Sequence, residues 1–430
     1  MAASAEQPAP PARSRRALLA GSVGNLVEWY EFGVYGYFAT VIAANFFTPE
    51  GGSDVEGLVK TYASFALAFF FRPIGAALFG RLGDRIGRRP TLILVIGLMT
   101  VATTLIGVLP TYATAGAAAP WLLTGLRILQ GLSAGGEFGG AVSLMTEFAP
   151  VGRRGLYGSW QSFTVALGLL GGAGVAALLA TVMSEQALHD WGWRLPFLLT
   201  LPLGLVALWL RLRLEETPSF RRTEAEPVER PPAADVVRAI LLGAGRIMGW
   251  AAAGYTFLVV LPSYLQSTLN ASFQEALIAT VLANVGFAAS IVPAGLLSDR
   301  IGRRAVMLTG AVLVTALALP LLTLLQDEGA STASKGLGVL AAGAVVGLMA
   351  GPGPAMLAEM FPTRVRYTGL GLAYALANAV FSGCAGLIIT ELVKRTGNAD
   401  IPAYYAAGAC AVSVLALLTL RGDDHRRPLR

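Results

Sequence analysis

Residues 80–90 read Gly-Arg-Leu-Gly-Asp-Arg-Ile-Gly-Arg-Arg-Pro, a short cationic turn between two long apolar segments. The pattern returns at residues 295–305 as Gly-Leu-Leu-Ser-Asp-Arg-Ile-Gly-Arg-Arg-Ala. Asp84 and Asp299 are 215 residues apart, which is half of the 430-residue chain. Self-similarity at a fixed offset is the signature of internal repetition, so this stretch predicts a tandem duplication.

A second pair of motifs supports the duplication. Glu147-Phe-Ala-Pro150 is followed by Arg154, and Glu359-Met-Phe-Pro362 is followed by Arg366. These two motifs are 212 residues apart, nearly the same offset as the first pair. Two independent echoes at nearly one offset divide the chain into two equivalent halves.

The composition is that of a membrane protein. Only 13% of residues are charged, 55% are apolar, and the mean hydropathy is +0.62. A soluble chain of this length needs more charge to cover its surface, so most of this one must face lipid. The net charge of +6 comes from Arg in short loops and forms no continuous basic face, which excludes nucleic acid as a partner. Cys384 and Cys410 fall in apolar runs without metal-ligand spacing, and we expect no metal and no cofactor.

Twelve runs are long enough to cross a bilayer, six in each half, and they predict an all-α membrane protein of two pseudo-symmetric six-helix bundles. The expected helices are 17–43, 58–81, 91–109, 119–146, 155–183, 194–213, 237–266, 275–297, 305–325, 336–358, 367–393 and 401–420. The domains follow as a disordered tail at 1–16, a first bundle at 17–213, a linker at 214–236, a second bundle at 237–420 and a tail at 421–430. Glu28 and Glu31 lie in the first apolar run, so we expect no cleavable signal peptide.

The orientation follows from the distribution of positive charge. Most of the 32 Lys and Arg residues fall in the tails, the linker and the loops on the side of the N-terminus. The loops of the opposite side hold only Lys60, Arg194, Lys335, Lys394 and Arg395. The positive-inside rule therefore places both termini in the cytoplasm, and an even number of helices gives the same result.

Several motifs together resemble the major facilitator superfamily, and more narrowly its metabolite:proton symporter family. They extend over most of residues 17–420 and comprise Gly24-Asn25 with Glu28-Trp-Tyr-Glu31-Phe32, Arg72-Pro73 before the 80–90 turn, Arg127 with Gln130-Gly131, Gly135-Gly-Glu137, Trp191-Gly-Trp-Arg194, Leu214-Glu-Glu-Thr-Pro218 and Glu359-Met-Phe-Pro362. Glu31 departs from the pattern, since members usually carry Asp there. The resemblance implies proton-coupled uptake of a small organic metabolite across a bacterial-type inner membrane, by a chain that works as a monomer among membrane lipids.

The two repeated turns predict a conformational latch. Glycines permit a tight reversal, and an Asp there can cap or bridge to a neighbouring helix end in one access state and release it in the other. Topology determination by positive charge alone would need neither the Asp nor fixed glycines. The expected gating residues are Asp84, Arg85, Arg88, Asp299, Arg300 and Arg303.

Four charged residues inside helices are candidates for proton coupling, because intramembrane charges are costly and by default functional. Glu28 and Glu31 share one face of the first helix, although a hydrogen-bonding structural role for Glu28 is equally open. Arg127 is placed to bind a carboxylate or to pair with an acid. Glu137 lies about 15 Å along the same helix and is therefore no partner for it. Arg127 and Glu31 have similar expected depths, so we expect them to interact when the site is empty.

The expected substrate-binding residues are mostly aromatic and lie in both halves: Trp29, Tyr30, Tyr35, Arg127, Gln130, Tyr255, Tyr374 and Asn378. Aromatic rings hold a quaternary ammonium by cation–π contact, which favours a zwitterionic osmolyte such as proline or glycine betaine. The segments 191–220 and Ile401–Tyr405 resemble the proline/betaine members and point the same way. Arg127, and Ser159-Trp-Gln-Ser162 with its resemblance to the citrate members, favour an organic acid such as α-ketoglutarate or citrate instead.

Other classes of protein fit poorly. The sequence has no phosphate-binding loop, and its two His residues, His189 and His425, fall in an outer loop and in the tail, so we expect neither an ATP-driven pump nor an enzyme. A transporter-like sensor without flux would carry a signalling domain, for which the linker and tails are too short. The sequence therefore predicts a secondary transporter that works by alternating access, with its substrate site near the midplane between the halves.

Overall fold

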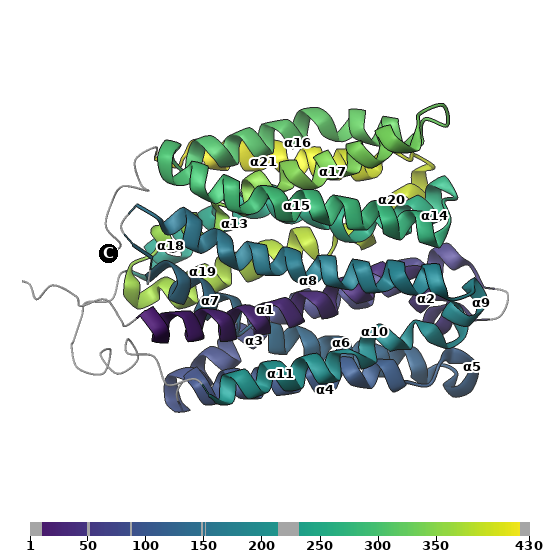
Figure 1. Cartoon of the computed structure of the whole chain (residues 1–430), viewed down its shortest axis with the longest axis horizontal. Coiled ribbons are helices and arrows are strands. Elements are labelled where there is room, and N and C mark those ends of the chain that lie inside the picture. The colour runs from purple at the N-terminus through teal and green to yellow at the C-terminus, as the bar shows by residue number, and fades with distance from the viewer. Residues whose placement is uncertain are drawn as a thin grey trace, which may run out of the picture.

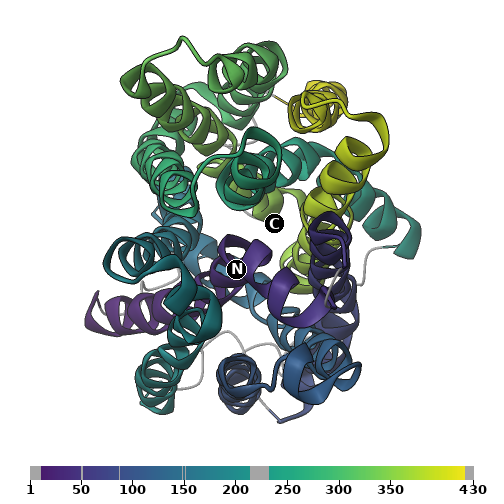
Figure 2. The same ribbon diagram turned by 90° about the vertical axis from the view of Figure 1, so that its right-hand side faces the viewer.

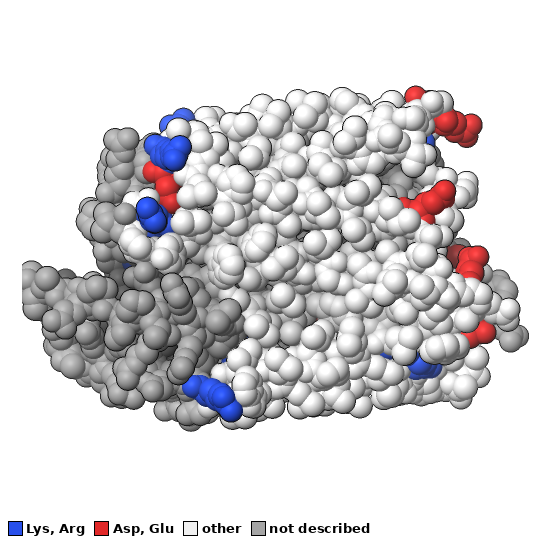
Figure 3. Space-filling model, viewed as in Figure 1, with Lys and Arg blue, Asp and Glu red and all other residues white. Residues whose placement is uncertain are grey.

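The computed structural model of the chain describes residues 11–49, 52–86, 88–147, 149–150, 152–213 and 232–421. Nearly all of these residues are helical, and none of them is in a strand. The helices run side by side along the longest axis of the molecule (Figure 1). A broad uncharged band covers the middle of the face in Figure 3, with Lys and Arg gathered toward the end where α16 begins and mainly Asp and Glu at the other.

The elements follow the two-fold division of the sequence, with π-helical turns marked η. The first half contains α1 (Pro11–Tyr37), α2 (Ala39–Ile42), η1 (Ala43–Phe47), α3 (Asp54–Ile86), α4 (Arg88–Val108), α5 (Tyr112–Ala115), α6 (Ala118–Ala134), α7 (Phe138–Glu147), α8 (Arg154–Val182), α9 (Glu185–Ala187), η2 (Leu188–Gly192), α10 (Arg194–Leu198) and α11 (Thr200–Leu212). The second contains α13 (Ala233–Tyr255), η3 (Thr256–Val260), α14 (Leu261–Leu269), α15 (Phe273–Ile301), α16 (Arg303–Gln326), α17 (Thr332–Ala350), α18 (Gly353–Met360), α19 (Thr363–Ala377), η4 (Asn378–Ser382), α20 (Ala385–Thr396) and α21 (Ile401–Leu418).

Ten helical runs in the described part of the chain are long and apolar enough to cross a membrane, and they match ten of the twelve expected helices. The other two expected helices are present as interrupted helical runs. The first is α1 to η1, which carries Glu28 and Glu31. The second is split by a turn at residues 135–137 into α6, of 17 residues, and α7, of 10. These two runs hold the four predicted coupling residues, Glu28, Glu31, Arg127 and Glu137.

Some boundaries differ from the expected ones. The first helix begins at Pro11, six residues before the expected start at 17. Residues 214–231 of the expected linker and 422–430 of the expected tail lie outside the described residues, and Ala233 already begins α13. Helix α17 ends at Ala350 and α18 begins at Gly353, so the Gly351-Pro-Gly-Pro sequence interrupts this run as its composition predicts.

The two halves meet along their length around a shared centre. Figure 2 shows the first-half helices, purple to teal, on one side and the second-half helices, green to yellow, on the other. Helix α8 packs lengthwise against α15 of the opposite half, and α3 packs against α19 and α20. Helices α3 and α6 of the first half approach closely because Gly131 has no Cβ atom, and a Cβ atom there would collide with the backbone of Ala68. Helix α3 therefore packs against α6 on one side and against the second half on the other.

Candidate functional site

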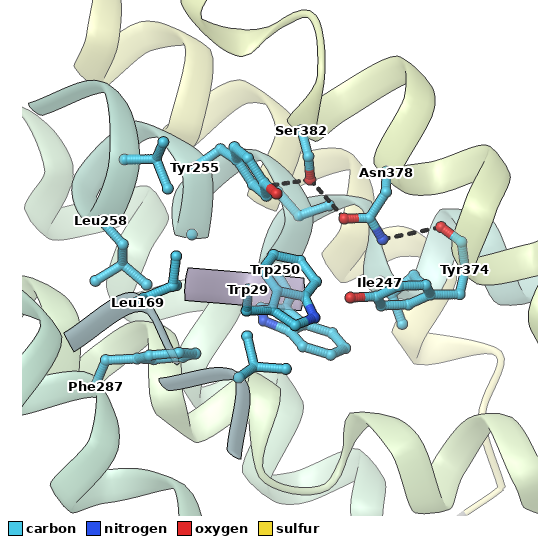
Figure 4. A pocket seen from close by; sticks show the side chains of 14 residues that line it. Trp29, Leu169, Ile247, Trp250, Tyr255, Leu258, Phe287, Tyr374, Asn378 and Ser382 are labelled. Carbon is cyan, nitrogen blue, oxygen red and sulfur yellow. Dashed lines mark hydrogen bonds between the residues drawn. The ribbon is translucent and has the colours of Figure 1, made fainter. Parts of the chain in front are cut away.

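A cavity of about 30 Å³ lies between the two halves. Its lining comes from both of them: Trp29, Val165, Leu169, Ile247, Trp250, Ala251, Gly254, Tyr255, Leu258, Val259, Phe287, Tyr374, Asn378 and Ser382. Figure 4 shows the indole rings of Trp29 and Trp250 at the middle of this group. A volume of this size holds about one or two water molecules. The conformation is therefore closed around its centre, and a metabolite enters only when the halves move apart.

Polar groups lie on the second-half side of the cavity. Asn378 donates from Nδ2 to the carbonyl of Tyr374 at 2.9 Å and accepts from the hydroxyl of Ser382 at 2.9 Å (Figure 4). Ser382 also lies 3.2 Å from the carbonyl of Ala251, to which it can donate instead. The amide and the hydroxyl belong to the π-helical turn η4, where the regular pattern of backbone hydrogen bonds is interrupted.

Four of the eight predicted substrate-binding residues line the cavity, namely Trp29, Tyr255, Tyr374 and Asn378. The other four are buried within the first half. Tyr30 donates to the carbonyl of Pro196 at 3.0 Å, and Tyr35 shares a 2.6 Å hydrogen bond with Ser64. Arg127 and Gln130 hydrogen-bond to each other and are fully buried. Neighbouring aromatic residues on a helix point in different directions, which explains why Trp29 and not Tyr30 faces the cavity.

Directly behind Trp29 lies a buried ion pair between α1 and α3. The Nη2 atom of Arg72 is 3.3 Å from Oε1 of Glu28. The guanidinium carbon of Arg72 is also 4.2 Å from the ring centre of Phe69 and 4.3 Å from that of Phe32. Both partners are shielded from solvent, with 3% of the Arg72 side chain and 7% of the Glu28 side chain exposed. A charge pair at this depth is expected to be functional rather than structural.

Glu31 and Arg127 are joined through two intervening side chains. Arg127 Nη1 donates to Gln130 Oε1 at 2.6 Å, Gln130 Nε2 donates to Thr103 Oγ1 at 2.5 Å, and Thr103 Oγ1 donates to Glu31 Oε2 at 2.8 Å. The donors all point from the cation toward the carboxylate, so the chain stabilises ionised Glu31. The remaining oxygen of Glu31, Oε1, is buried and has no hydrogen-bond partner among the described residues.

Arg127 and Glu31, which we expected to interact, are connected through Gln130 and Thr103 and make no direct contact. The two residues lie close enough to be linked, as their similar depths along the two helices suggested. Gln130 lies one turn from Arg127 on the same helix and fills the space between them. Within the described residues the ion pair of helix α1 is formed by Glu28 with Arg72. Depth along two helices cannot show which side chain of a third element stands between them.

Glu137 forms a separate ion pair with Arg211 of α11. Arg211 also donates to the carbonyl of Leu92 at 3.1 Å. As expected, Glu137 is not the partner of Arg127. The pair lies inside the first bundle, and neither residue is among those that line the cavity.

The second of the two repeated turns, which contains Asp299, contacts the opposite half. The carboxylate of Asp299 accepts from the backbone N–H groups of Gly155 at 2.8 Å and Leu156 at 2.9 Å, which belong to the first turn of α8 in the opposite half. A carboxylate at a helix N-terminus is favoured by the unpaired N–H groups and by the helix dipole. Gly302, which joins α15 to α16 with φ of 95°, adopts a conformation that favours glycine.

Arg303 extends this latch into a network across the interface. It contacts Asp299 at 2.7 Å and Glu359 at 3.0 Å, and Glu359 is also 3.5 Å from Arg154 of α8. Arg300 is exposed and lies outside the core of this network. The side chains of Asp84, Arg85 and Arg88 lie outside the described residues, although the backbone is helical on both sides of residue 87. One end of the molecule is therefore closed by charged groups from both halves.

The opposite end is closed by weaker polar contacts. Tyr62 shares a 2.7 Å hydrogen bond with Ser263, and Thr40 donates to Gln266 at 3.1 Å. Both bonds join the first half to the second. The two ends thus differ in chemistry. Nearly buried ion pairs hold the first, whereas the second has hydroxyl and amide hydrogen bonds and one exposed ion pair, between Lys394 and Glu56 at 3.3 Å.

The sequence analysis missed several residues of this site. Arg72 was noted only as part of a motif, although it stands in an apolar run and the rule that singled out Arg127 applies equally to it. Arg211 lies near a helix end, where a cation ordinarily reaches the interface. Trp250, Ser382 and Thr103 carry no signal in sequence that separates them from ordinary helix residues.

A closed cavity between two repeated helical bundles, with buried charges beside it and a charged latch at one end, defines a secondary transporter. The comparisons with known proteins identify the group. Residues 17–230 match the family model described as "Sugar (and other) transporter", and residues 247–430 match the one described as "Major Facilitator Superfamily".

Curated relatives cover most of the chain. It is 35% identical to the proline/betaine transporter of Escherichia coli K12, over 97% of this chain and 85% of the relative. It is 37% identical to the alpha-ketoglutarate permease of the same strain, over 94% and 93%. It is 35% identical to the citrate-proton symporter of Klebsiella pneumoniae, over 93% and 90%. The chain belongs to the major facilitator superfamily, in the metabolite:proton symporter family with these relatives.

Solved structures share the fold. A crystal structure of a D-xylose-proton symporter superposes with a TM-score of 0.76 at 21% identity, over 94% of this chain and 96% of the other. An inward open conformation of the xylose transporter XylE from E. coli superposes with a TM-score of 0.72 at 20% identity. The chain is therefore a multi-pass inner-membrane transporter with the major facilitator fold, and it is not an enzyme.

Proposed function

We propose that this protein is a proton-coupled symporter that imports a zwitterionic osmolyte, such as proline or glycine betaine, by alternating access. The observation that carries the proposal is the aromatic cavity between the halves, with a guanidinium group behind one of its walls. Trp29, Trp250, Tyr255 and Tyr374 surround the centre, and the Arg72 guanidinium is 5.4 Å from the ring centre of Trp29. Aromatic faces attract a quaternary or secondary ammonium, and a guanidinium attracts the carboxylate of the same molecule.

Glu31 is the proposed site of the coupled proton. It is fully buried near the middle of the first membrane helix, and one of its oxygens has no partner among the described residues. An isolated carboxylate in such a place is costly when ionised, so a proton taken from the outside is held there until the site opens inward. The hydrogen-bond chain to Arg127 stabilises the ionised form, which allows the proton to be released.

The relatives support the same substrate class. Proteins described as proline/betaine transporters match over 97% of the chain at about a third identity, and a glycine betaine/proline/ectoine/pipecolic acid transporter of Dickeya dadantii matches at 36%. All of the molecules named in the last description combine a carboxylate with a cationic nitrogen. The proposed orientation has both termini in the cytoplasm, and the latch of Asp299 then closes the cytoplasmic end.

An organic acid is the second candidate. Arg72 and Arg127 are two buried guanidinium groups in one half, and both retain nitrogen atoms without hydrogen-bond partners among the described residues. Two such groups suit a molecule with two carboxylates, and the alpha-ketoglutarate permease matches at 37% identity. Either substrate is carried through the central cavity between the two halves of one chain, so we propose that the monomer is the working unit and that lipids surround it.

Transport by the purified protein in proteoliposomes tests the proposal. The panel contains glycine betaine, proline, α-ketoglutarate and citrate, each with an imposed inward proton gradient. We expect accumulation of the two zwitterions, driven by the proton gradient and abolished by a protonophore. Accumulation of only the organic acids would overturn the osmolyte assignment. Uptake that follows a sodium gradient and persists with the protonophore would overturn proton coupling.

A further inference from the structure

We infer that Arg72 and Tyr255 form the subsite for the substrate carboxylate, and that Glu28 occupies Arg72 when this subsite is empty. The inference rests on the proposed function and adds to it a second acid, which exchanges with the substrate. Arg72 comes from α3 of the first half, and Tyr255 comes from the end of α13 in the second half. The subsite is therefore complete only when the two halves are together.

Arg72 has one loosely held partner. Its Nη2 atom is 3.3 Å from Glu28 Oε1, yet neither Nη2 nor Nε makes a hydrogen bond within the described part of the chain. The guanidinium group is packed among the rings of Trp29, Phe32 and Phe69, at 4.2 to 5.4 Å from their centres. Buried donors without acceptors are costly, so a second carboxylate in this place would gain hydrogen bonds that Glu28 does not make.

Tyr255 supplies an independent donor from the other half. Its hydroxyl group is buried and has no hydrogen-bond partner among the residues that the structure describes. Its ring lines the cavity and contacts the rings of Phe69 at 5.3 Å and Trp29 at 6.2 Å, which are two of the rings around Arg72. A carboxylate that enters from the cavity between Trp29 and Tyr255 thus meets donors from both halves.

Arg127 does not fit this role as well. It is covered by Phe32, Tyr35 and Phe65, at 4.1 to 5.0 Å from their ring centres, and none of these three residues lines the cavity. Its Nη1 atom is already engaged by Gln130 at the start of the chain that leads to Glu31. Arg127 therefore serves the proton site, while Arg72 is the guanidinium that a substrate in the cavity reaches first.

The exchange links substrate binding to protonation of Glu28. When the substrate carboxylate pairs with Arg72, Glu28 loses its counter-ion in a site with 6% of its surface exposed. The other charged groups that act on Glu28 are Glu137 and Arg211, which are paired with each other, and Glu31 on its own helix. No free cation among these replaces Arg72, so Glu28 takes up a proton from the open side and becomes neutral. The substrate remains ionised.

The test compares two ligands that differ in the carboxylate alone. Glycine betaine and choline both carry a trimethylammonium group, and choline has a hydroxyl group in place of the carboxylate. Binding to the purified full chain is measured for both by calorimetry across a range of pH. We expect the wild type to prefer glycine betaine, and Arg72→Gln to lose roughly 10- to 100-fold of this preference, as expected for hydrogen bonds to a charged group. Tyr255→Phe should lose a smaller part.

Glu28→Gln tests the exchange in the opposite direction. This variant imitates protonated Glu28 and leaves Arg72 without its carboxylate partner. It should therefore bind glycine betaine at least as tightly as the wild type, and its binding should lack the pH dependence that Glu28 causes in the wild type. Wild-type binding should instead strengthen as pH falls, because protonation of Glu28 frees Arg72. Arg395→Gln is the matched control, since it removes an exposed Arg from a pair with Glu391 and should change neither property.

The possible outcomes decide between the ideas. A preference unchanged in Arg72→Gln, or weaker and still equally pH-dependent binding in Glu28→Gln, overturns the inference. If Arg72→Gln does not reach the membrane, Tyr255→Phe and the charge-conserving Arg72→Lys provide the same comparison. If the wild type binds α-ketoglutarate and neither glycine betaine nor choline, the osmolyte assignment fails. The subsite is then tested with α-ketoglutarate. Loss of α-ketoglutarate binding in Arg72→Gln, with binding retained in Glu28→Gln, supports the subsite, and any other result overturns it.

Discussion

The two halves of the molecule share a sequence pattern and a helical arrangement but differ in the chemistry of their centres. In the first half, Glu28, Glu31, Arg72 and Arg127 are buried inside the bundle, and none of them lines the cavity. In the second half the residue 215 positions after Arg72 is Phe287, and the residue 215 positions after Arg127 is Ala342. Phe287 lines the cavity as an apolar ring, so the second half has an aromatic ring where the first half has a guanidinium group.

The charges of the second half gather at its end instead. Asp299, Arg303 and Glu359 bind one another and the first turn of α8 at the interface between the halves. Buried charges near the centre are suited to carry a proton and a substrate carboxylate, whereas charges at an end are suited to hold one access state closed. The difference indicates a division of work, with ion coupling in the first half and a latch in the second.

The largest expected effect is at the centre of the first half. Glu31→Gln should abolish proton-driven accumulation and leave substrate counterflow largely intact, because exchange of substrate needs no net proton movement. Accumulation and counterflow are measured in the same proteoliposomes. The matched variant Glu31→Asp keeps a carboxylate with a shorter reach and should retain accumulation. Equal loss of both activities in Glu31→Gln would mean that Glu31 binds substrate or supports the fold, and the proposed division would fail.

A smaller effect is expected at the latch of the second half. Asp299→Asn removes the charge that caps the first turn of α8, which weakens the closed end by about 1–2 kcal/mol on the scale of helix caps. This shifts the access equilibrium and slows transport severalfold, with little change in the amount of protein in the membrane. Initial rates and hydrogen exchange of the α8 backbone measure the two effects. Arg300→Gln, on the exposed side of the same turn, is the control.

The result at Asp299 also separates two explanations of the repeated turn. Wild-type rates in Asp299→Asn, with unchanged exchange protection of Gly155 and Leu156, would reduce the turn to a topology signal. If Asp299→Asn instead lowers the ratio of protons to substrate and leaves the transport rate unchanged, ion coupling involves the second half. That result would contradict the proposed division of work between the halves.

The fold was predictable because its signals are local. Each of these signals depends on a short segment of sequence: the length of an apolar run, the repeated turns at 80–90 and 295–305, and the charges of the loops. Together they predict the two bundles. The recurring Asp also pointed to Asp299 as a residue with a contact outside its own turn, and the structure places it against the first turn of α8; its role as a latch stays a prediction.

The site was only partly predictable because it depends on partners from distant elements. Trp29 and Tyr30 are neighbours in sequence, yet the first lines the cavity and the second binds Pro196. Arg127 and Glu31 were matched by depth, but Thr103 and Gln130 stand between them, and Glu28 pairs with Arg72 of another helix. Helical spacing gives the face of one helix and not the identity of the side chain opposite it.

The smallest effect is expected at the centre of the second half, at Asn378. This side chain lines the cavity, donates to the carbonyl of Tyr374 and accepts from Ser382, and it carries no charge. Asn378→Ala should weaken substrate binding roughly 2- to 10-fold, the range of one or two neutral hydrogen bonds. Because no ionisable group is removed, the pH dependence of binding and the ratio of protons to substrate should stay as in the wild type.

The control for Asn378→Ala is Ser413→Ala, which removes a buried hydroxyl of the same half that bonds to the Arg246 carbonyl and does not line the cavity. Binding by calorimetry and proton flux measured together with substrate flux give both quantities. Retained coupling with weaker binding supports a second half that selects the substrate without handling the proton. A changed proton ratio in Asn378→Ala, absent from Ser413→Ala, would show that the polar turn η4 belongs to the proton path, and ion coupling would then be shared between the halves.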